Sequence, residues 1–434
     1  MNPPRPPAGA PSAASMAMAP GTMRLPRRRS GQGSTIIAAA VLLTAAMFTN
    51  SALTIAGADR ESMLFLEYAL WTASAVWMLS SLPPTPRLGR IGSPMRKGMI
   101  AFLIGLAAST MLVWNIGLRF DIDRLLPQVA ALVFMTLPFF VLNAAAKATE
   151  MEKATLVTCH VILATCLISI LSDVMGLTDF EHGGGRYFGF LGDPVAWALT
   201  LPFVVYFSRG QLLLAAAAGL GMALTGSRAP AICVAAALLM LITFSRGRRV
   251  QYFVTLFLLF LLILYKSDVF ETLASRFEAT KLGSNDRLGT ALLGWRIFQK
   301  SPYFGTGYNS LNHLFPYRFT STLQNTLSAQ TSTFVQMLSD GGLLLFLGYV
   351  FFVAAATVTG IGLLRRSRTD PGSGAINGIV AWVLAMLWVN QSAAWFVVGS
   401  YVGPLVLGMA GIMAGYRSRQ LIMRAHARAR MPQG

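Results

Sequence analysis

The chain has 434 residues, of which 54% are hydrophobic and only 12% are charged, and its mean hydropathy is +0.57. This composition indicates a protein that crosses a membrane several times. The formal net charge of +18 does not indicate a nucleic-acid partner, because basic loops that face anionic lipid head groups account for it.

Residues 1–34 are rich in Pro, Ala, Gly, Met and Ser, which predicts a disordered cytoplasmic tail. Apolar stretches follow, and each predicts a helix because backbone polar groups in lipid must be paired internally. We interpret the first stretch as an uncleaved span and not as a signal peptide, since it is too long for one. The predicted spans are 35–57, 62–82, 98–118, 125–145, 154–176, 194–208, 211–226, 230–245, 250–265, 341–363, 375–391 and 394–415.

The connectors between these stretches alternate in charge, as the positive-inside rule requires. One side holds most of the 35 lysines and arginines and only three acidic residues, Glu150, Glu152 and Asp370. We expect this side, which includes both termini, to be the cytoplasm. The predicted fold is all-α: a polytopic inner-membrane protein of about twelve transmembrane helices, with one large periplasmic loop that carries short helices. The predicted segments are helices at 35–265, the loop at 266–340, helices at 341–416 and a basic tail at 417–434.

The loop contains about 75 residues that are too polar to enter lipid and too long for a plain link. Residues 271–282 have amphipathic helical spacing, and residues 292–298 suit a helix on the membrane surface. The pair Ser301-Pro302 predicts the end of that helix, and residues 305–307 predict a turn. Helical character resumes at 333–338, so we interpret the loop as a small lid.

Three arginines stand out on the outer side, where cations are sparse: Arg186, Arg228 and Arg287. A guanidinium group offers a fixed fork of donors and stays charged. Two or three such groups that converge would therefore suit a phosphate or diphosphate head group. The alternative for each is an ordinary arginine at the membrane surface, paired with a loop carboxylate such as Glu181, Asp193 or Asp286.

The sequence around these arginines resembles that of a known family. Leu224-Thr225-Gly226-Ser227-Arg228-Ala229-Pro230 is similar to the Ser-Arg-Gly/Ala signature of the O-antigen ligase and polysaccharide polymerase family. Arg287, Trp295 and residues 302–307 resemble the pattern in that family's loop, an arginine, a helix and then Pro-x-x-Gly-x-Gly. Arg186 with residues 189–194 resembles its arginine-glycine stretch. The resemblance spans roughly residues 180–350.

The resemblance implies glycosyl transfer at the periplasmic face: polymerisation of undecaprenyl-diphosphate-linked oligosaccharide repeat units into surface polysaccharide. It implies no cofactor and no metal, since arginines would neutralise the diphosphate leaving group in place of a metal. The implied partners are the lipid-linked glycan, membrane lipid, a chain-length regulator and a flippase. Within the family, the alternative is a ligase that transfers the glycan to lipid A core.

The general base, which takes the proton from the acceptor hydroxyl, is left open by the sequence. Ligases of this family carry a His-Asn pair shortly before the glycine that opens the next span, whereas counting back from Gly342 gives Thr331 and Ser332. The absence of the pair favours a polymerase. His313 and Asp340 are the candidate catalytic residues, although a lone loop histidine is more often a solvated side chain or makes a structural hydrogen bond.

A secondary transporter or flippase for an anionic lipid or metabolite is the second hypothesis. Ionisable residues within spans are often functional in transporters. Glu67 and Asp173 are the examples here, but we expect Glu67 to lie too near the outer surface for a proton relay and Asp173 to lie at the membrane interface. Paired helix breaks and internal repeats, which are typical of transporters, are not evident, and one long lid breaks any symmetry. A transporter predicts ion-coupled movement across a vesicle membrane.

Overall fold

The computed structural model describes residues 32–56, 60–82, 93–115, 122–177, 187–192, 194–244, 254, 257, 294–305, 333–366, 374–389 and 402–429. The labelled elements over these residues are eleven α-helices and one 3-10 helix, a further helical stretch lies at 294–300, and no strand is present among them. The all-α class predicted from the sequence is confirmed for this part of the chain. Asp193, named above as a possible partner of an arginine, lies outside the described residues.

The helices lie on the apolar stretches that the sequence indicates. In chain order they are α1 (Gln32–Ala56), α2 (Arg60–Ser81), α3 (Pro94–Asn115), α4 (Ile122–Ala148), α5 (Glu152–Val174), the 3-10 helix η2 (Gly189–Leu191), α6 (Pro194–Arg209), α7 (Leu212–Leu224), α8 (Arg228–Phe244), α13 (Thr333–Arg366), α14 (Gly374–Val389) and α15 (Val402–Ala429). Residues 294–300 are also helical.

Two helices extend beyond the spans expected for them. Helix α13 begins at Thr333, inside the expected loop, and α15 continues to Ala429, through most of the basic tail. The helix at 294–300 ends at Ser301, whose amide donates to Ile297 O and Phe298 O, in agreement with the predicted end. The helix expected at 271–282 and most of the stretch 250–265 lie outside the described residues.

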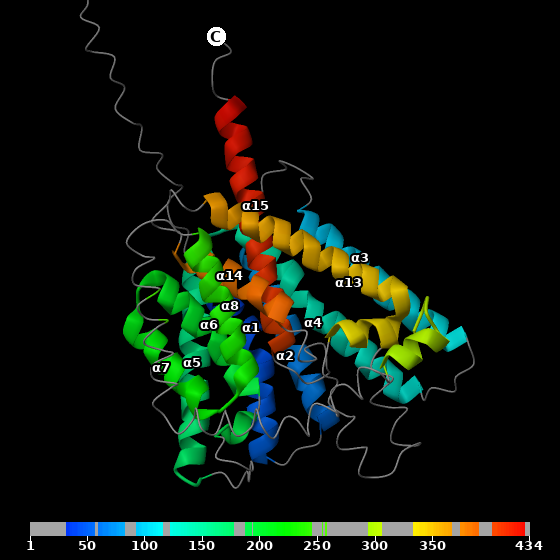
Figure 1. Cartoon of the computed structure of the whole chain (residues 1–434), viewed down its shortest axis with the longest axis horizontal. Helices are drawn as coiled ribbons and strands as arrows, with labels where there is room; N and C mark the ends of the chain where they lie inside the picture. The colour runs from blue at the N-terminus through cyan, green and yellow to red at the C-terminus, as the bar shows by residue number, and fades with distance from the viewer. Residues whose placement is uncertain are drawn as a thin grey trace, which may run out of the picture.

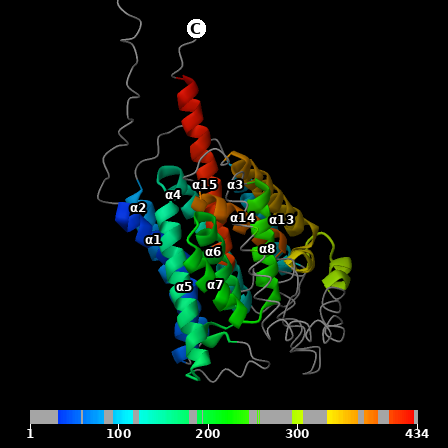
Figure 2. The same cartoon turned by 60° about the vertical axis from the view of Figure 1, so that its left-hand side comes forward.

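Helices α3 and α13 lie side by side and are tilted with respect to α1 and α5 (Figures 1 and 2). They approach backbone to backbone at glycines. A Cβ added at Gly98 would lie 2.8 Å from Phe352 Cα, and one at Gly348 would lie 2.8 Å from Ala101 O. Small residues that allow such close approach are typical of helix pairs in lipid, where packing replaces the hydrophobic driving force. The α4–α15 pair is built in the same way, around Gly411 and Gly415.

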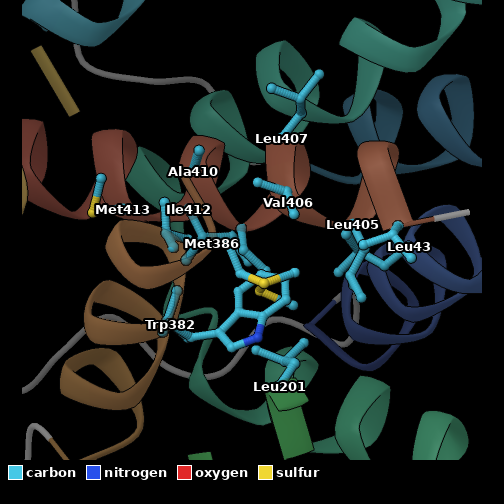
Figure 3. Packing of buried hydrophobic residues seen from close by; sticks show 14 of the residues in the cluster. Leu43, Leu201, Trp382, Met386, Leu405, Val406, Leu407, Ala410, Ile412 and Met413 are labelled. Atoms are coloured by element: carbon cyan, nitrogen blue, oxygen red, sulfur yellow. The ribbon is translucent and has the colours of Figure 1, made fainter. Parts of the chain in front are cut away.

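The centre of the bundle is formed by α14 between α6 and α15. Trp382 of α14 is fully buried, and its Nε1 donates to Thr200 Oγ1 of α6 at 2.6 Å. Met386 lies beside Trp382, and both face the apolar side chains of α15 (Figure 3). The indole N–H is therefore paired within the core, as a buried donor requires.

Two described helices, α5 and α13, are long and apolar enough to cross a membrane, judged by length and composition. Shorter apolar helices accompany them, including α7 and α14. Large apolar side chains also point outward from the bundle, among them Phe65, Leu213 and Val358, which are 76%, 84% and 72% exposed. An exposed apolar surface of this kind suits contact with lipid.

Two ion pairs gather charged connectors at one end of the bundle. Arg209, at the end of α6, pairs with Glu152 at the start of α5, and Arg419 of α15 pairs with Glu150 at 3.4 Å. The charge pattern assigns these four residues to the same side of the membrane. We call this the Arg209 end. The opposite end, where α5 and α7 finish and α6 and α8 begin, is called the Arg228 end.

Candidate active site

Arg228 is the first residue of α8 and follows a three-residue turn that closes α7. The turn is held from within: Thr225 is buried, and its Oγ1 donates to Met222 O at 2.7 Å. The first backbone N–H groups of a helix have no intrahelical partner and form the positive end of the helix dipole. The backbone at Arg228 therefore favours an anion.

The stretch that follows Arg186 is anchored on the end of α5 by a carboxylate. Asp173 Oδ2 accepts a hydrogen bond from Phe188 N at 2.9 Å and another from Gly189 N at 3.1 Å. The sequence marked Asp173 only as an ionisable residue near a membrane surface. In the structure it fixes the backbone of the arginine-glycine stretch.

Ser169, one turn earlier on α5, makes the second anchor. Its Oγ donates to Phe188 O at 2.9 Å and accepts from Leu191 N at 3.1 Å. Gly189 has φ of +61°, and a Cβ at this position would overlap the carbonyl group of Ser169. A glycine is required there for both reasons, its backbone conformation and its close contact with α5.

One hydrogen bond joins the two arginine-bearing segments. The amide of Tyr187, the residue after Arg186, donates to Leu224 O at the end of α7 at 3.3 Å. Leu224 opens the turn that leads to Arg228. The structure thus brings the backbone of both family-like motifs to the Arg228 end of the bundle.

Helix α13 is folded back on itself at Gly342, which has φ of +61°. The ring of Phe334, before this point, lies 5.7 Å from the ring of Tyr349 and 5.8 Å from that of Phe346, both after it. In a straight helix, residues 334 and 349 would be about 22 Å apart along the axis. The segment Thr333–Gly341, which we call the returning segment, therefore packs against the first turns of the long part of α13.

The glycine motif of the predicted lid docks on this fold. The amide of Leu343 donates to Pro302 O at 2.8 Å, and the amide of Leu344 donates to Tyr303 O at 3.2 Å. These bonds satisfy donors of α13 that the break at Gly342 frees. A Cβ on Gly305 would overlap the carbonyl group of Asp340. The Pro-x-x-Gly part of the motif is thus a docking element for α13.

Ser109 of α3 contacts both the glycine motif of the loop and the returning segment. It is fully buried, and its Oγ lies 2.9 Å from Phe304 O and 3.1 Å from Asp340 O, so that its hydroxyl donor serves both carbonyl groups. The helix at 294–300 adds a further contact, because Gly294 abuts Val335 of the returning segment. No sequence signal marks Ser109, which stands in a run of small residues.

Asp340 is fully buried in the returning segment, and its Oδ1 accepts a hydrogen bond from Ser339 Oγ at 3.2 Å. Burial of a carboxyl group away from water suits a proton acceptor that must act on a bound hydroxyl group. The sequence placed Asp340 among the candidate bases. The structure places it beside the docked motif, and its role as a base stays a prediction.

Gln336, which the sequence did not single out, lies one turn before Asp340. Its side chain is 1% exposed, and within the described part of the chain neither Nε2 nor Oε1 has a hydrogen-bond partner. An unpaired buried polar atom costs about 1–3 kcal/mol. Such an amide is unusual in a folded protein.

The other predicted site residues are placed only in part. Arg186, Arg287 and His313 lie outside the described residues, and for Arg228 the backbone alone is described. Helices α8 and α13, which carry Arg228 and Asp340, are in contact. Among the described residues no group of three or more His, Cys, Asp or Glu side chains is arranged to hold a metal ion.

Comparison with known proteins identifies the segment that contains most of these features. Residues 213–350 match the family described as O-antigen ligase. The match runs from α7 through the start of the long part of α13, and it includes Arg228, Arg287, His313 and Asp340 but not Arg186. The resemblance recognised from the motifs is confirmed over this segment. No curated protein matches the chain.

Proposed function

We propose that this chain is a membrane enzyme of the O-antigen ligase and polysaccharide polymerase family, and that it polymerises undecaprenyl-diphosphate-linked oligosaccharide repeat units at the periplasmic face of the inner membrane. The family match at residues 213–350 supports a polysaccharide-forming membrane enzyme in general. The observation that carries the specific proposal is the hydrogen bond from Tyr187 to Leu224, since it joins two arginine-bearing segments at one end of the bundle.

The chemistry assigned to this end is a displacement at the anomeric carbon of the donor glycan. An acceptor hydroxyl oxygen forms the new bond to that carbon while the bond to the diphosphate oxygen breaks, and undecaprenyl diphosphate leaves with the electron pair. Arg228, with Arg186 and Arg287, neutralises the developing charge on the diphosphate. Asp340 or His313 takes the proton of the acceptor hydroxyl.

A polymerase is preferred over a ligase because the His-Asn pair of the ligases is absent before Gly342. In a polymerase the acceptor is a second lipid-linked glycan, and in a ligase it is lipid A core. The docking of residues 302–305 on α13 is compatible with both reactions. The chain-length regulator and flippase named by the family resemblance are expected partners in the polymerase case.

The test is the glycan pool of a strain that lacks the chain, resolved by gel and mass spectrometry. Single repeat units stranded on the carrier, without long chains, are the expected result. Long chains stranded on the carrier would identify a ligase instead. An unchanged pool would refute enzymatic activity and favour the transport hypothesis.

Complementation of that strain tests the site. Arg228→Ala is expected to insert normally and to restore less than about 1% of the polymer, since one preorganised charge-stabilising group contributes on the order of 100-fold or more to the rate. Arg209→Ala, the same change at the opposite end of the bundle, is the matched control and should restore full-length polymer. Normal polymer from both variants would refute the role of Arg228.

A further inference from the structure

The buried amide of Gln336 has no explanation in the fold. Its two polar atoms lack partners within the described residues, and its side chain is 1% exposed. Several backbone groups nearby are paired: Ser109 serves two carbonyl groups, and the amides of Leu343 and Leu344 donate to Pro302 O and Tyr303 O. A fully buried side-chain amide with neither polar atom paired among the described residues points to a ligand that completes it.

Gln336 belongs to a polar stripe on the returning segment. Thr333, Gln336 and Asp340 follow one another at positions i, i+3 and i+7, so they share one face of the helix. All three are at most 1% exposed. A fully buried polar face is unusual for a helix that packs among apolar side chains.

The backbone that carries this stripe is fixed from three directions. Ser109 binds the carbonyl group of Asp340, Gly305 abuts the same peptide group, and Gly294 abuts Val335. A binding group gains most when its own position is settled before the ligand arrives. The stripe meets that condition.

The charge of the stripe selects among ligands. The returning segment has the sequence Thr-Phe-Val-Gln-Met-Leu-Ser-Asp-Gly, which contains no Lys or Arg and one carboxyl group, that of Asp340. A phosphate bound to this segment would therefore find no cation within it and would meet the carboxyl group of Asp340. A sugar, in contrast, is neutral and offers adjacent hydroxyl groups, one of which can accept from Nε2 while the other donates to Oε1.

We propose that Gln336 binds adjacent hydroxyl groups of a neutral sugar residue in the acceptor glycan, next to Asp340 on the same helical face. This inference rests on the proposed function and divides the site into two parts. The donor diphosphate lies with the arginines of the Arg228 end, and the acceptor sugar lies with the polar stripe of the returning segment, which contains no Lys or Arg. Gln336 is then a substrate-binding residue that selects the acceptor.

The test uses a probe without the diphosphate. The lipid-linked glycan that accumulates in the strain lacking the chain is extracted, and its oligosaccharide is released by mild acid. Binding of this free oligosaccharide to the purified full-length protein in lipid nanodiscs is then measured by equilibrium dialysis. Because the probe carries no phosphate, it reports the sugar part of the site alone.

Gln336→Met keeps the length of the side chain and removes its polar atoms. We expect about tenfold weaker binding of the free oligosaccharide, the loss that corresponds to one or two hydrogen bonds. Thermal unfolding should be unchanged or shifted upward, since an unpaired amide is removed. Gln336→Glu, which keeps the acceptor but loses the donor, should also bind more weakly and provides a second variant if the methionine variant does not fold.

Two controls make the result specific. Gln211→Met is the same substitution at a glutamine of the Arg209 end whose Oε1 is also buried and unpaired, and it should bind like the wild type. Arg228→Ala should bind the free oligosaccharide normally while losing polymer formation.

The inference is overturned if the Gln336 variants bind the oligosaccharide as the wild type does, or if the wild type does not bind it. Failure of the proposed function would look different. The wild-type protein would make no polymer from the intact lipid-linked glycan, whereas Gln336-dependent binding of the free oligosaccharide would persist and would support the sugar site.

Discussion

Gly305 lies against the peptide group between Asp340 and Gly341, so that a Cβ added to Gly305 would lie 2.5 Å from Gly341 N. This contact links a turn of the long loop to Asp340, the candidate general base that lies within the described part of the chain. Because Ser109 also binds the carbonyl group of Asp340, the position of this residue is set through its backbone. Its side chain accepts a hydrogen bond from Ser339 Oγ through Oδ1.

Gly305→Ala should undock the lid motif from α13. Gly305 has φ of +67°, and the added methyl group would overlap the Asp340 carbonyl group, so backbone strain and steric overlap combine. We expect a destabilisation of about 3 kcal/mol or more together with loss of polymer. Thermal unfolding in detergent and tryptic cleavage of the loop would measure it.

Substitutions at two other glycines distinguish the effect of backbone strain from that of steric overlap. Gly210 has φ of +77° but open space around it, so Gly210→Ala should lose only about 1–2 kcal/mol from backbone strain. Gly362 is helical and also has open space, so alanine there should be neutral or stabilising by about 0.5–1 kcal/mol. A Gly305 variant no worse than the Gly210 variant would contradict docking through this contact.

Ser109→Ala removes the hydroxyl group shared by Phe304 O and Asp340 O. Two buried carbonyl groups lose a donor, and the expected loss of stability is about 1–3 kcal/mol. Since the change also loosens Asp340, kcat should fall more than binding of the free oligosaccharide. Ser80→Ala is the control, because the Ser80 hydroxyl is exposed and donates to Trp77 O within its own helix turn. Equal effects of the two substitutions would show that Ser109 has no special role.

Asp173→Ala should weaken the arginine-glycine stretch by removing the acceptor of two backbone N–H groups. The carboxylate accepts from Phe188 N and Gly189 N, and hydrogen bonds to a charged acceptor contribute about 1.5–3 kcal/mol each. Asp173→Asn keeps an acceptor oxygen and should retain most of the activity. The exposed pairing of Glu152 with Arg209 provides a contrast, since Glu152→Gln should lose less than about 1 kcal/mol. Full polymer from Asp173→Ala would contradict the anchoring role.

The orientation of the bundle can be tested by labelling with a membrane-impermeant maleimide. The native cysteines Cys159, Cys166 and Cys233 are all buried, so only introduced thiols should react. Leu177→Cys, at a position 72% exposed at the Arg228 end, should be labelled from the periplasm. Lys153→Cys, at the Arg209 end, should be labelled only after the inner membrane is permeabilised. The reverse pattern would invert the predicted topology and with it the location of the chemistry.

The sequence by itself determined the helical class, the positions of the helices and the segment with the family motifs. These features depend on local properties, since apolar length, charge between stretches and residues such as Ser301-Pro302 act within a few turns of the chain. The predicted span 341–363 corresponds to the long part of α13. It did not show that residues 333–341, on the other side of the break at Gly342, belong to the same element and pack back on it.

Only the tertiary structure decided what the motifs do. The fold-back of α13 brings the ring of Phe334 against the ring of Tyr349. The docking of the glycine motif depends on contacts among Gly305, Ser109 and Asp340, which lie in three separate segments. The unpaired amide of Gln336 is recognised only when everything around it is in place, because an amide in a sequence carries no sign of whether it has a partner. Contacts between distant segments, and the burial that they create, thus set the position and pairing of the polar groups at this site.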